Sequence, residues 1–299
     1  MASTVQKLAE KGLITPPGFL ARNVHYETMM GSIAYGVSDD SSDVDIYGFC
    51  IPPKDLVFPH LAGHIPGFGK QVQAFNQYQQ HHVKVPGTTK DYDLAIYSII
   101  RFFQLCMENN PNMLDSLFTP RRCVLHCTAV GEMVRSNRKM FLHKGCWPKY
   151  KGYAYSQLHK MSGQKREGKR KAAFDKYGFD VKFAYHVVRL LYEAEMILQE
   201  GDLDLERNRE HLKAIRRGEI SEQEIRDWAS SKETALEKVY DNSKLQWGPD
   251  QDKIKGLLLE CLEHHYGSLS DAVMPEHAML RALRNVRDEI DKVRGILEK

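Results

Sequence analysis

The chain has 299 residues, of which 42% are hydrophobic and 27% are charged, and its formal net charge is +3. This balance is typical of a folded globular protein and excludes an intrinsically disordered chain. So small a net charge does not by itself indicate nucleic-acid binding, which would need local clustering of basic residues.

The length and the spacing of special residues set the organisation of the chain. The first thirty residues lack the apolar core of a signal peptide, and no run of about 18 apolar residues follows. The six cysteines are widely spaced, as is usual for reduced thiols. We therefore expect a cytoplasmic protein without a membrane partner. Domains usually span about 100–200 residues, so we predict two, at residues 1–122 and 123–299.

The first half carries strand signals. Residues 23–30 and 44–51 are short runs of β-formers and apolar residues that flank a polar segment rich in Gly, Ser and Asp. Another strand is predicted around residues 80–85. From Asp93 the chain turns into an apolar run that indicates a strand end followed by a buried helix, which Pro111 should stop.

The second half is predicted to be mainly helical. Helical periodicity marks residues 179–199, 221–239 and 276–297. Ser221 with Glu224 three residues later has the form of a capping box, which indicates a helix start at that point.

Two aspartates at the start of the second predicted strand indicate a metal site. Asp43 and Asp45 are two residues apart, so on a strand their carboxylates face the same side. Magnesium prefers oxygen ligands, and two strand aspartates with a third from elsewhere can hold the two ions of an in-line phosphoryl displacement. Asp93 is the candidate for the third carboxylate, and Asp91 is the alternative because it lies on the same side of an extended strand.

The segment before these aspartates suits an anion. Gly31 lets the backbone approach a triphosphate closely, and the Ser32 hydroxyl with nearby amides can bind phosphate oxygens. Taken singly, an Asp-x-Asp pair is more often a solvated strand edge and a Gly-Ser pair is more often a turn. Their combination in this order favours a nucleotide site.

The combination resembles a known family. Residues 31–36 (GSIAYG) followed by residues 42–48 (SDVDIYG) are similar to the signature of the DNA polymerase β-like nucleotidyltransferase superfamily, in particular its branch of predicted bacterial and phage enzymes. The run from Asp93 to Tyr97, the turn at residues 110–112 and the segment 177–190 also resemble that branch. The resemblance covers roughly residues 20–220.

The resemblance implies an α+β fold, with a mixed β-sheet catalytic domain and a helical C-terminal domain. It also implies transfer of a nucleoside monophosphate from a nucleoside triphosphate such as ATP, an EC 2.7.7-type reaction, with Mg²⁺ or Mn²⁺ as the cofactor. The implied catalytic and metal-binding residues are Asp43, Asp45 and Asp93. The implied nucleotide-binding residues are Gly31, Ser32, Tyr35, Ser42, Lys182, His186 and Arg189.

The last three of these residues form a stripe on a predicted helix. Lys182, His186 and Arg189 are spaced at i, i+4 and i+7, so they share one face and could neutralise transferring phosphates. Helical spacing alone favours a different interpretation, a solvent-facing stripe paired with Glu193 and Asp180. The family resemblance favours the phosphate-facing one.

A basic stretch at residues 165–171 raises the question of the acceptor. It reads most simply as a solvated surface, but with Tyr150, Tyr153 and Tyr155 nearby it could follow an RNA or tRNA backbone and stack bases. The acceptor hydroxyl could belong to an RNA end, a protein side chain or a small molecule. Two other functions stay open: a nucleotide-binding regulatory module without turnover, and a toxin–antitoxin or phage-defence enzyme that modifies a protein.

Overall fold

A computed structural model describes most of the chain. The described residues are 2–38, 42–65, 67–69, 73–88, 90–163 and 168–269, together with Leu283, Val286, Arg287, Ile290 and Arg294. The predicted helix at residues 276–297 therefore lies largely outside the described residues. In the described part of the chain, no helix combines the length and the apolar character needed to cross a membrane.

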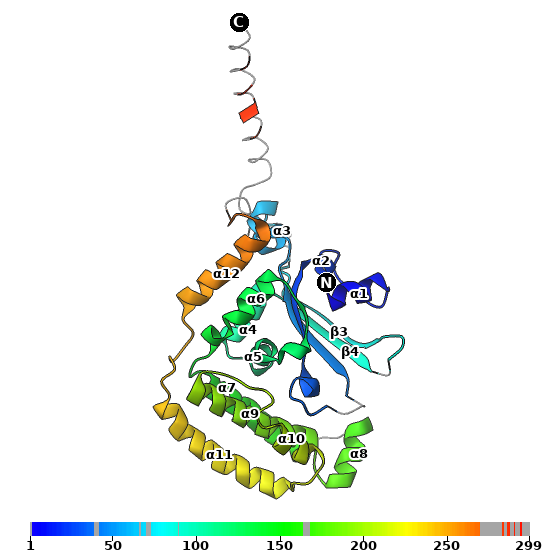
Figure 1. Ribbon diagram of the computed structural model, residues 1–299, viewed down its shortest axis with the longest axis vertical. Helices are drawn as coiled ribbons and strands as arrows, with labels where there is room; N and C mark the ends of the chain where they lie inside the picture. Colours follow the sequence, from blue (N-terminus) through cyan, green and yellow to red (C-terminus); the bar gives the residue numbers. More distant parts are fainter. Residues whose placement is uncertain are drawn as a thin grey trace.

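A mixed five-stranded sheet is the centre of the N-terminal half (Figure 1). The strand order is β3-β4-β2-β1-β5, and β2 with β4 is the parallel pair while the other neighbours are antiparallel. The strands are β1 (Val24–Met29), β2 (Val44–Cys50), β3 (Gln77–Lys84), β4 (Asp91–Ser98) and β5 (Val124–Cys127).

The two faces of the sheet bury different cores because successive side chains of a strand point to opposite sides. Ile46, Leu94 and Ile96 point into a small core beneath the N-terminal helices. Phe49 and Ala95 point into a larger core that continues into the helical half. The short elements around the small core are α1 (Thr4–Glu10) and α2 (Leu20–Asn23), and α3 (Lys54–Val57) with the 3₁₀ turn η2 (Pro59–Ala62) follows β2.

Helices cover the other face of the sheet and then form a separate layer below it (Figure 1). The helices next to the sheet are α4 (Ile99–Met107), α5 (Pro111–Phe118) and α6 (Ala129–Ser136), with the 3₁₀ turns η1 (Gly31–Ile33), η3 (Arg121–Cys123) and η4 (Arg138–Phe141) between elements. The helical half contains the layer of α7 (Cys146–Gly163), α8 (Gly168–Tyr177), α9 (Val181–Glu200), α10 (Arg209–Arg216) and α11 (Glu222–Asn242). Its last helix, α12 (Gln251–Tyr266), returns to lie against α4 and α6 (Figure 1).

The fold class is the expected α+β arrangement. The predicted strands at 23–30 and 44–51 and the strand-to-helix run after Asp93 are confirmed, and the strand expected around 80–85 is β3. The capping box at Ser221 is present. Pro111 differs in its role, because α4 already ends at Met107 and Pro111 is the first residue of α5. The sheet also contains β5, so it continues past residue 122; the division into domains at that residue stays a prediction.

Candidate active site

The predicted carboxylates gather at one end of the parallel strand pair. Asp45 of β2 lies directly opposite Asp93 of β4 in the register of the two strands. Both side chains are on the face that carries the larger core, and both are partly exposed. Asp43 precedes β2, is exposed, and is close enough to act electrostatically on Asp45. The parallel pairing therefore brings together carboxylates that are some fifty residues apart in the chain.

The Gly-Ser turn closes over these carboxylates. Gly31 has a φ of +63°, and a Cβ atom placed on it would lie 2.3 Å from Oδ2 of Asp45, so only glycine fits. The N–H of Met30 donates to the carbonyl of Asp45 at 2.7 Å, which ties the turn to β2. Ser32 follows in η1, and its carbonyl accepts the N–H of Val37 at 2.9 Å. The close contact that Gly31 allows in this structure is with the Asp45 side chain, and the predicted approach of this backbone to a triphosphate stays a prediction.

The pKa of Asp45 is shifted at this end of the two strands. Burial raises the pKa of Asp45 above its ordinary value, the neighbouring Asp93 carboxylate raises it further, and the Lys182 ammonium opposes the rise. Like charges held together and partly desolvated are costly unless a cation joins them. Burial and the neighbouring carboxylate thus both act against the charged form of Asp45.

A bulge in β3 holds Asp93 in place. The register of β3 against β4 shifts between Gln80 and Val83, and His82 in this bulge has a positive φ of 55°. The His82 N–H donates to Oδ1 of Asp93 at 2.7 Å, and Nδ1 of His81 lies 3.6 Å from Oδ2. Backbone strain of this kind is concentrated at functional sites. Sequence patterns did not reveal the bulge, because a register shift leaves no mark in residue type.

Asp91, the alternative third carboxylate, lies farther from Asp45. It pairs with Lys84 in the register of β3 and β4, and its Oδ2 is 3.8 Å from Nδ1 of His82. The group that acts most strongly on Asp45, after burial, is Asp93. This geometry favours Asp93 as the third carboxylate.

The predicted stripe on α9 divides between two environments. Lys182 is exposed in the first turn of α9, where Asp180 caps the helix and accepts the N–H of Lys182 at 3.0 Å. His186, one turn on, is half-buried and contacts the Tyr185 ring with centroids 4.7 Å apart. Arg189 is buried and pairs with Asp115 and Glu193. Of the three, Lys182 is the one that the structure brings to the carboxylates.

Two other predicted nucleotide-binding residues also differ in placement. Ser42 is half-buried directly before Asp43, at the carboxylate edge. Tyr35 is buried, and its hydroxyl donates to Asp115 rather than facing the edge. The alternative interpretation of the α9 stripe is thus met in part, because Arg189 does pair with Glu193, although in the interior.

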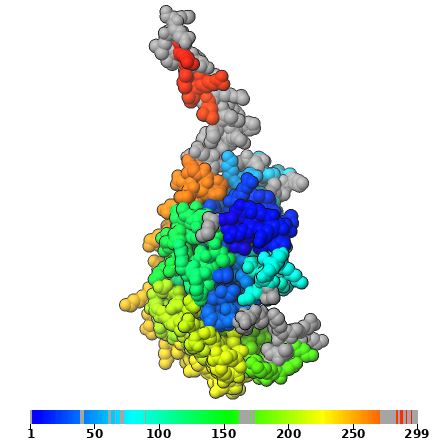
Figure 2. All heavy atoms as spheres, turned by 45° about the vertical axis from the view of Figure 1, so that its right-hand side comes forward, coloured from blue at the N-terminus to red at the C-terminus, as the bar shows by residue number. Residues whose placement is uncertain are grey.

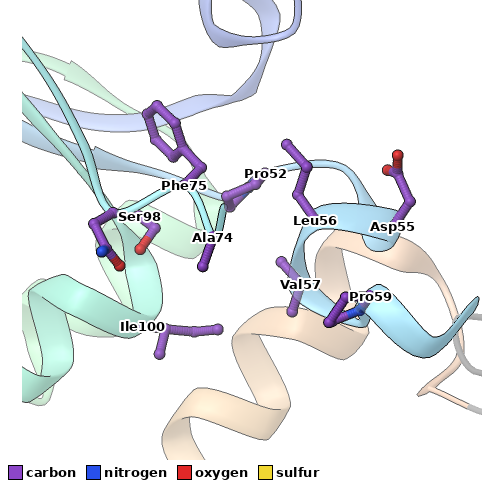
Figure 3. Close-up of a pocket in the computed structure, with 10 residues that line it drawn as sticks. Pro52, Asp55, Leu56, Val57, Pro59, Ala74, Phe75, Ser98 and Ile100 are labelled. Carbon is purple, nitrogen blue, oxygen red and sulfur yellow. The ribbon is translucent and has the colours of Figure 1, made fainter. Parts of the chain in front are cut away.

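Figure 2 shows the blue segments of the turn and the start of β2 between the cyan β3–β4 hairpin and the yellow-green helices of the helical half. A separate pocket of about 270 Å³ lies near Pro52, Leu56, Phe75 and Ser98 (Figure 3). Ser98 is the last residue of β4, so this mostly apolar pocket is at the opposite end of the strands, roughly 17 Å along β4 from Asp93. It is not part of the carboxylate site.

The donor set fits a hard divalent cation, since carboxylate oxygens are the ligands that Mg²⁺ prefers. Gly31 makes room for the Asp45 carboxylate, because a Cβ atom at this position would lie 2.3 Å from its Oδ2. Within the described ranges, no three His, Cys, Asp or Glu side chains are placed so that they could hold a metal ion, and the three-carboxylate metal site of Asp43, Asp45 and Asp93 stays a prediction.

Fold and site together define a protein of the polymerase β-like class. The chain belongs to the RlaP family, described as the RNA repair pathway DNA polymerase beta family, whose model matches residues 6–276. The match spans both the sheet and the helical half.

Two individual proteins are similar to the chain. An uncharacterized 38.9 kDa protein in the nrdC-mobD intergenic region of Enterobacteria phage T4 is 27% identical over 137 residues, which are 45% of this chain and 37% of that protein. A solved structure of a nucleotidyltransferase-like protein from Exiguobacterium sibiricum covers 79% of this chain and 73% of its own, with 9% identity and a TM-score of 0.29. The chain therefore spans little more than a third of the phage relative.

Proposed function

We propose that this protein transfers a nucleoside monophosphate from a nucleoside triphosphate to an acceptor hydroxyl, with an RNA or tRNA end as the acceptor. The observation that carries the proposal is the in-register pair of Asp45 and Asp93 beneath the Gly31 turn. The family description, which refers to an RNA repair pathway, supports RNA as the acceptor class.

Asp43, Asp45 and Asp93 would hold Mg²⁺ or Mn²⁺ in this proposal. Such an ion stabilises the charge that develops on the attacking and leaving oxygens. The raised pKa of Asp45 supports the assignment, because the cost of its charge in the free protein is offset when a cation binds.

The residues of the chain itself have distinct tasks in the transfer. The amides of the turn and the Ser32 hydroxyl would bind the triphosphate, and Lys182 would neutralise part of its charge. The acceptor oxygen forms a bond to the α-phosphorus, the bond from that phosphorus to the β-phosphate bridging oxygen breaks, and pyrophosphate leaves. Asp93, held by the His82 N–H, would accept the proton of the acceptor hydroxyl.

The basic region beside α9 supports an RNA acceptor. Lys171 and Lys176 of α8 are exposed, and Figure 1 shows α8 below the carboxylate end of the sheet. Residues 165–167 of the predicted basic stretch lie outside the described residues. Of the three tyrosines considered for base stacking, Tyr150 is fully buried and so not available, whereas Tyr153 and Tyr155 are exposed.

The test is label transfer from each α-³²P nucleoside triphosphate, in the presence of Mg²⁺, to RNA with a free 3′ hydroxyl. The matched control is the same RNA with a 3′-deoxy end. We expect label on the first RNA and none on the second. Label on both RNAs would contradict 3′-end transfer, and label on a protein acceptor alone would support the defence-enzyme alternative. Nucleotide binding without label on any acceptor would support a regulatory module.

A further inference from the structure

A buried polar cluster lies behind the candidate site. The Tyr35 hydroxyl donates to Oδ2 of Asp115 and accepts an N–H from Arg189. The same nitrogen of Arg189 lies 2.5 Å from Oδ2 of Asp115 and donates to Oε1 of Glu193 at 3.1 Å. We call these four residues, Tyr35, Asp115, Arg189 and Glu193, the buried polar cluster.

The cluster joins three segments that are far apart in the chain. Tyr35 comes from the turn after η1, Asp115 from α5, and both Arg189 and Glu193 from α9. The Arg189 guanidinium also lies over the Tyr35 ring, 4.5 Å from its centroid. All four residues are buried, with Asp115 at 0% exposed and Arg189 at 6%. Contacts of this kind are short, desolvated and directional, so they fix the relative position of their segments.

The charges of the cluster balance only if one carboxyl group is neutral. It contains a single guanidinium and two carboxyl groups, and burial raises the pKa of Glu193 well above its ordinary value. Burial also raises the pKa of Asp115, against the opposing effect of Arg189 and the hydrogen bond from Tyr35. Because Arg189 lies closer to Asp115, at 2.5 Å, than to Glu193, at 3.1 Å, we take Asp115 as the counter-ion of Arg189.

Both ends of the cluster continue into the candidate site. Tyr35 is four residues from Gly31, in the turn that closes over Asp45. Arg189 is seven residues beyond Lys182 on the same helix, about 10 Å along its axis. The turn also lies close to the segment before α10: a Cβ atom placed on Gly36 would be 2.9 Å from Oε1 of Glu206.

From this geometry we infer that Asp115 is a positioning residue, which holds Tyr35 against Arg189 and so fixes the Gly31–Ser32 turn relative to Lys182. The inference rests on the proposed function, since the turn and Lys182 are the triphosphate-binding parts of that proposal. It assigns Tyr35 and Arg189 to the support of the nucleotide site rather than to direct contact with the nucleotide.

Tyr35→Phe is the variant that tests this assignment most cleanly, because it removes the linking hydroxyl and keeps the ring. The matched control is Tyr185→Phe, since Tyr185 is also buried next to the cluster and its hydroxyl has no hydrogen-bond partner among the described residues. Each full-length variant is studied by hydrogen–deuterium exchange of the peptide covering residues 31–37, by thermal unfolding, and by label-transfer kinetics.

The expected result is a specific loosening of the turn. In Tyr35→Phe, the amides of residues 31–37 should exchange faster, on the order of tenfold. The kcat should fall by a similar factor, on the order of tenfold, because misplaced reacting groups lower the rate of the chemical step. In Tyr185→Phe both should match the wild type. Unchanged exchange in Tyr35→Phe, or equal changes in both variants, would overturn the inference.

The exchange measurement separates this inference from the proposed function. If the wild-type protein transfers no label to any acceptor, the proposed function fails, while faster exchange in Tyr35→Phe alone still supports the positioning role. If the wild type is active and Tyr35→Phe keeps both its kcat and its exchange rate, the proposed function stands and the positioning role is contradicted.

Discussion

Two groups of acidic residues in this protein lie in contrasting environments. At the end of β2 and β4, Asp45 and Asp93 lie opposite each other in register, and both are partly exposed. In the buried polar cluster, Asp115 and Glu193 surround Arg189 and are closed to solvent. In the proposed function the first arrangement binds an external cation, whereas in the second the counter-ion is Arg189 of the chain itself. Residue type alone does not separate function from support; burial and partners do.

The largest effect should separate Asp93 from Asp91. Asp93→Asn is expected to lower kcat/KM for label transfer by about 1000-fold, equal to ~4 kcal/mol, because a carboxylate that serves both ion and proton is lost. Asp91→Asn, on the same side of the same strand, is expected to stay within about twofold of the wild type, since its loss is that of a peripheral charge. Steady-state kinetics of both variants at equal Mg²⁺ decide the matter, and the reverse order would make Asp91 the third carboxylate.

The next effect concerns stability. Arg189→Met should lower the free energy of unfolding by about 3 kcal/mol, because it leaves the buried Asp115 without its counter-ion. Arg207→Met is the control: Arg207 pairs with Glu200 on the surface, where such a pair contributes about 0–1 kcal/mol. Urea unfolding measures both. Equal losses in the two variants would show that the buried polar cluster does not hold the fold.

Lys182 gives a smaller effect with a defined sign. Its ammonium opposes the rise in the pKa of Asp45, so Lys182→Gln lets that pKa rise further. Asp45 must be ionised to bind a cation, and the acid side of the kcat/KM profile should therefore move to higher pH. At neutral pH the variant should lose on the order of tenfold in kcat/KM, as the triphosphate loses a positive partner.

The matched control for Lys182→Gln is Lys213→Gln, because Lys213 pairs with Glu210 on the surface of α10. Its pH profile should coincide with that of the wild type. A Lys182→Gln profile that moves to lower pH, or that does not move, would contradict the electrostatic account of the site.

Glu193 gives the smallest effect, seen as a pH dependence. The pKa of Glu193 is raised in the folded state, so its contribution to stability is full below the ordinary carboxyl range and is lost as pH rises through the folded-state pKa. Glu193→Gln stays neutral, so its free energy of unfolding should fall less from pH 5 to pH 9 than that of the wild type. Parallel curves would show that Glu193 is ionised in the fold.

The local signals in the sequence predicted much of the fold and the open part of the site. Strand pattern predicted β1 and β2. Of the two aspartates, Asp45 lies within β2 and Asp43 directly precedes it, so the shared face of their carboxylates stays a prediction. The four residues of β5 escaped prediction because they are only half-buried and carry no strand pattern of their own. Local pattern is informative where the relevant neighbours are close in the chain.

The supporting part of the site was beyond such signals. Arg189 and Asp115 are 74 residues apart, and helical spacing cannot show that the end of a polar stripe enters the core. The His82 amide acts through a register shift, not through a side chain. Both features depend on how separate elements pack against one another, whereas local sequence patterns predict only the elements themselves.

The central assignment is that the carboxylate end of β2 and β4 is the catalytic centre. Single-turnover label transfer by Asp45→Asn, together with the free energy of unfolding of this variant, tests it most directly. Because the pKa of Asp45 is raised in the fold, the neutral amide should leave the protein at least as stable as the wild type at pH 7 while transfer falls by about 1000-fold. A folded Asp45→Asn protein that transfers label at the wild-type rate would contradict the assignment.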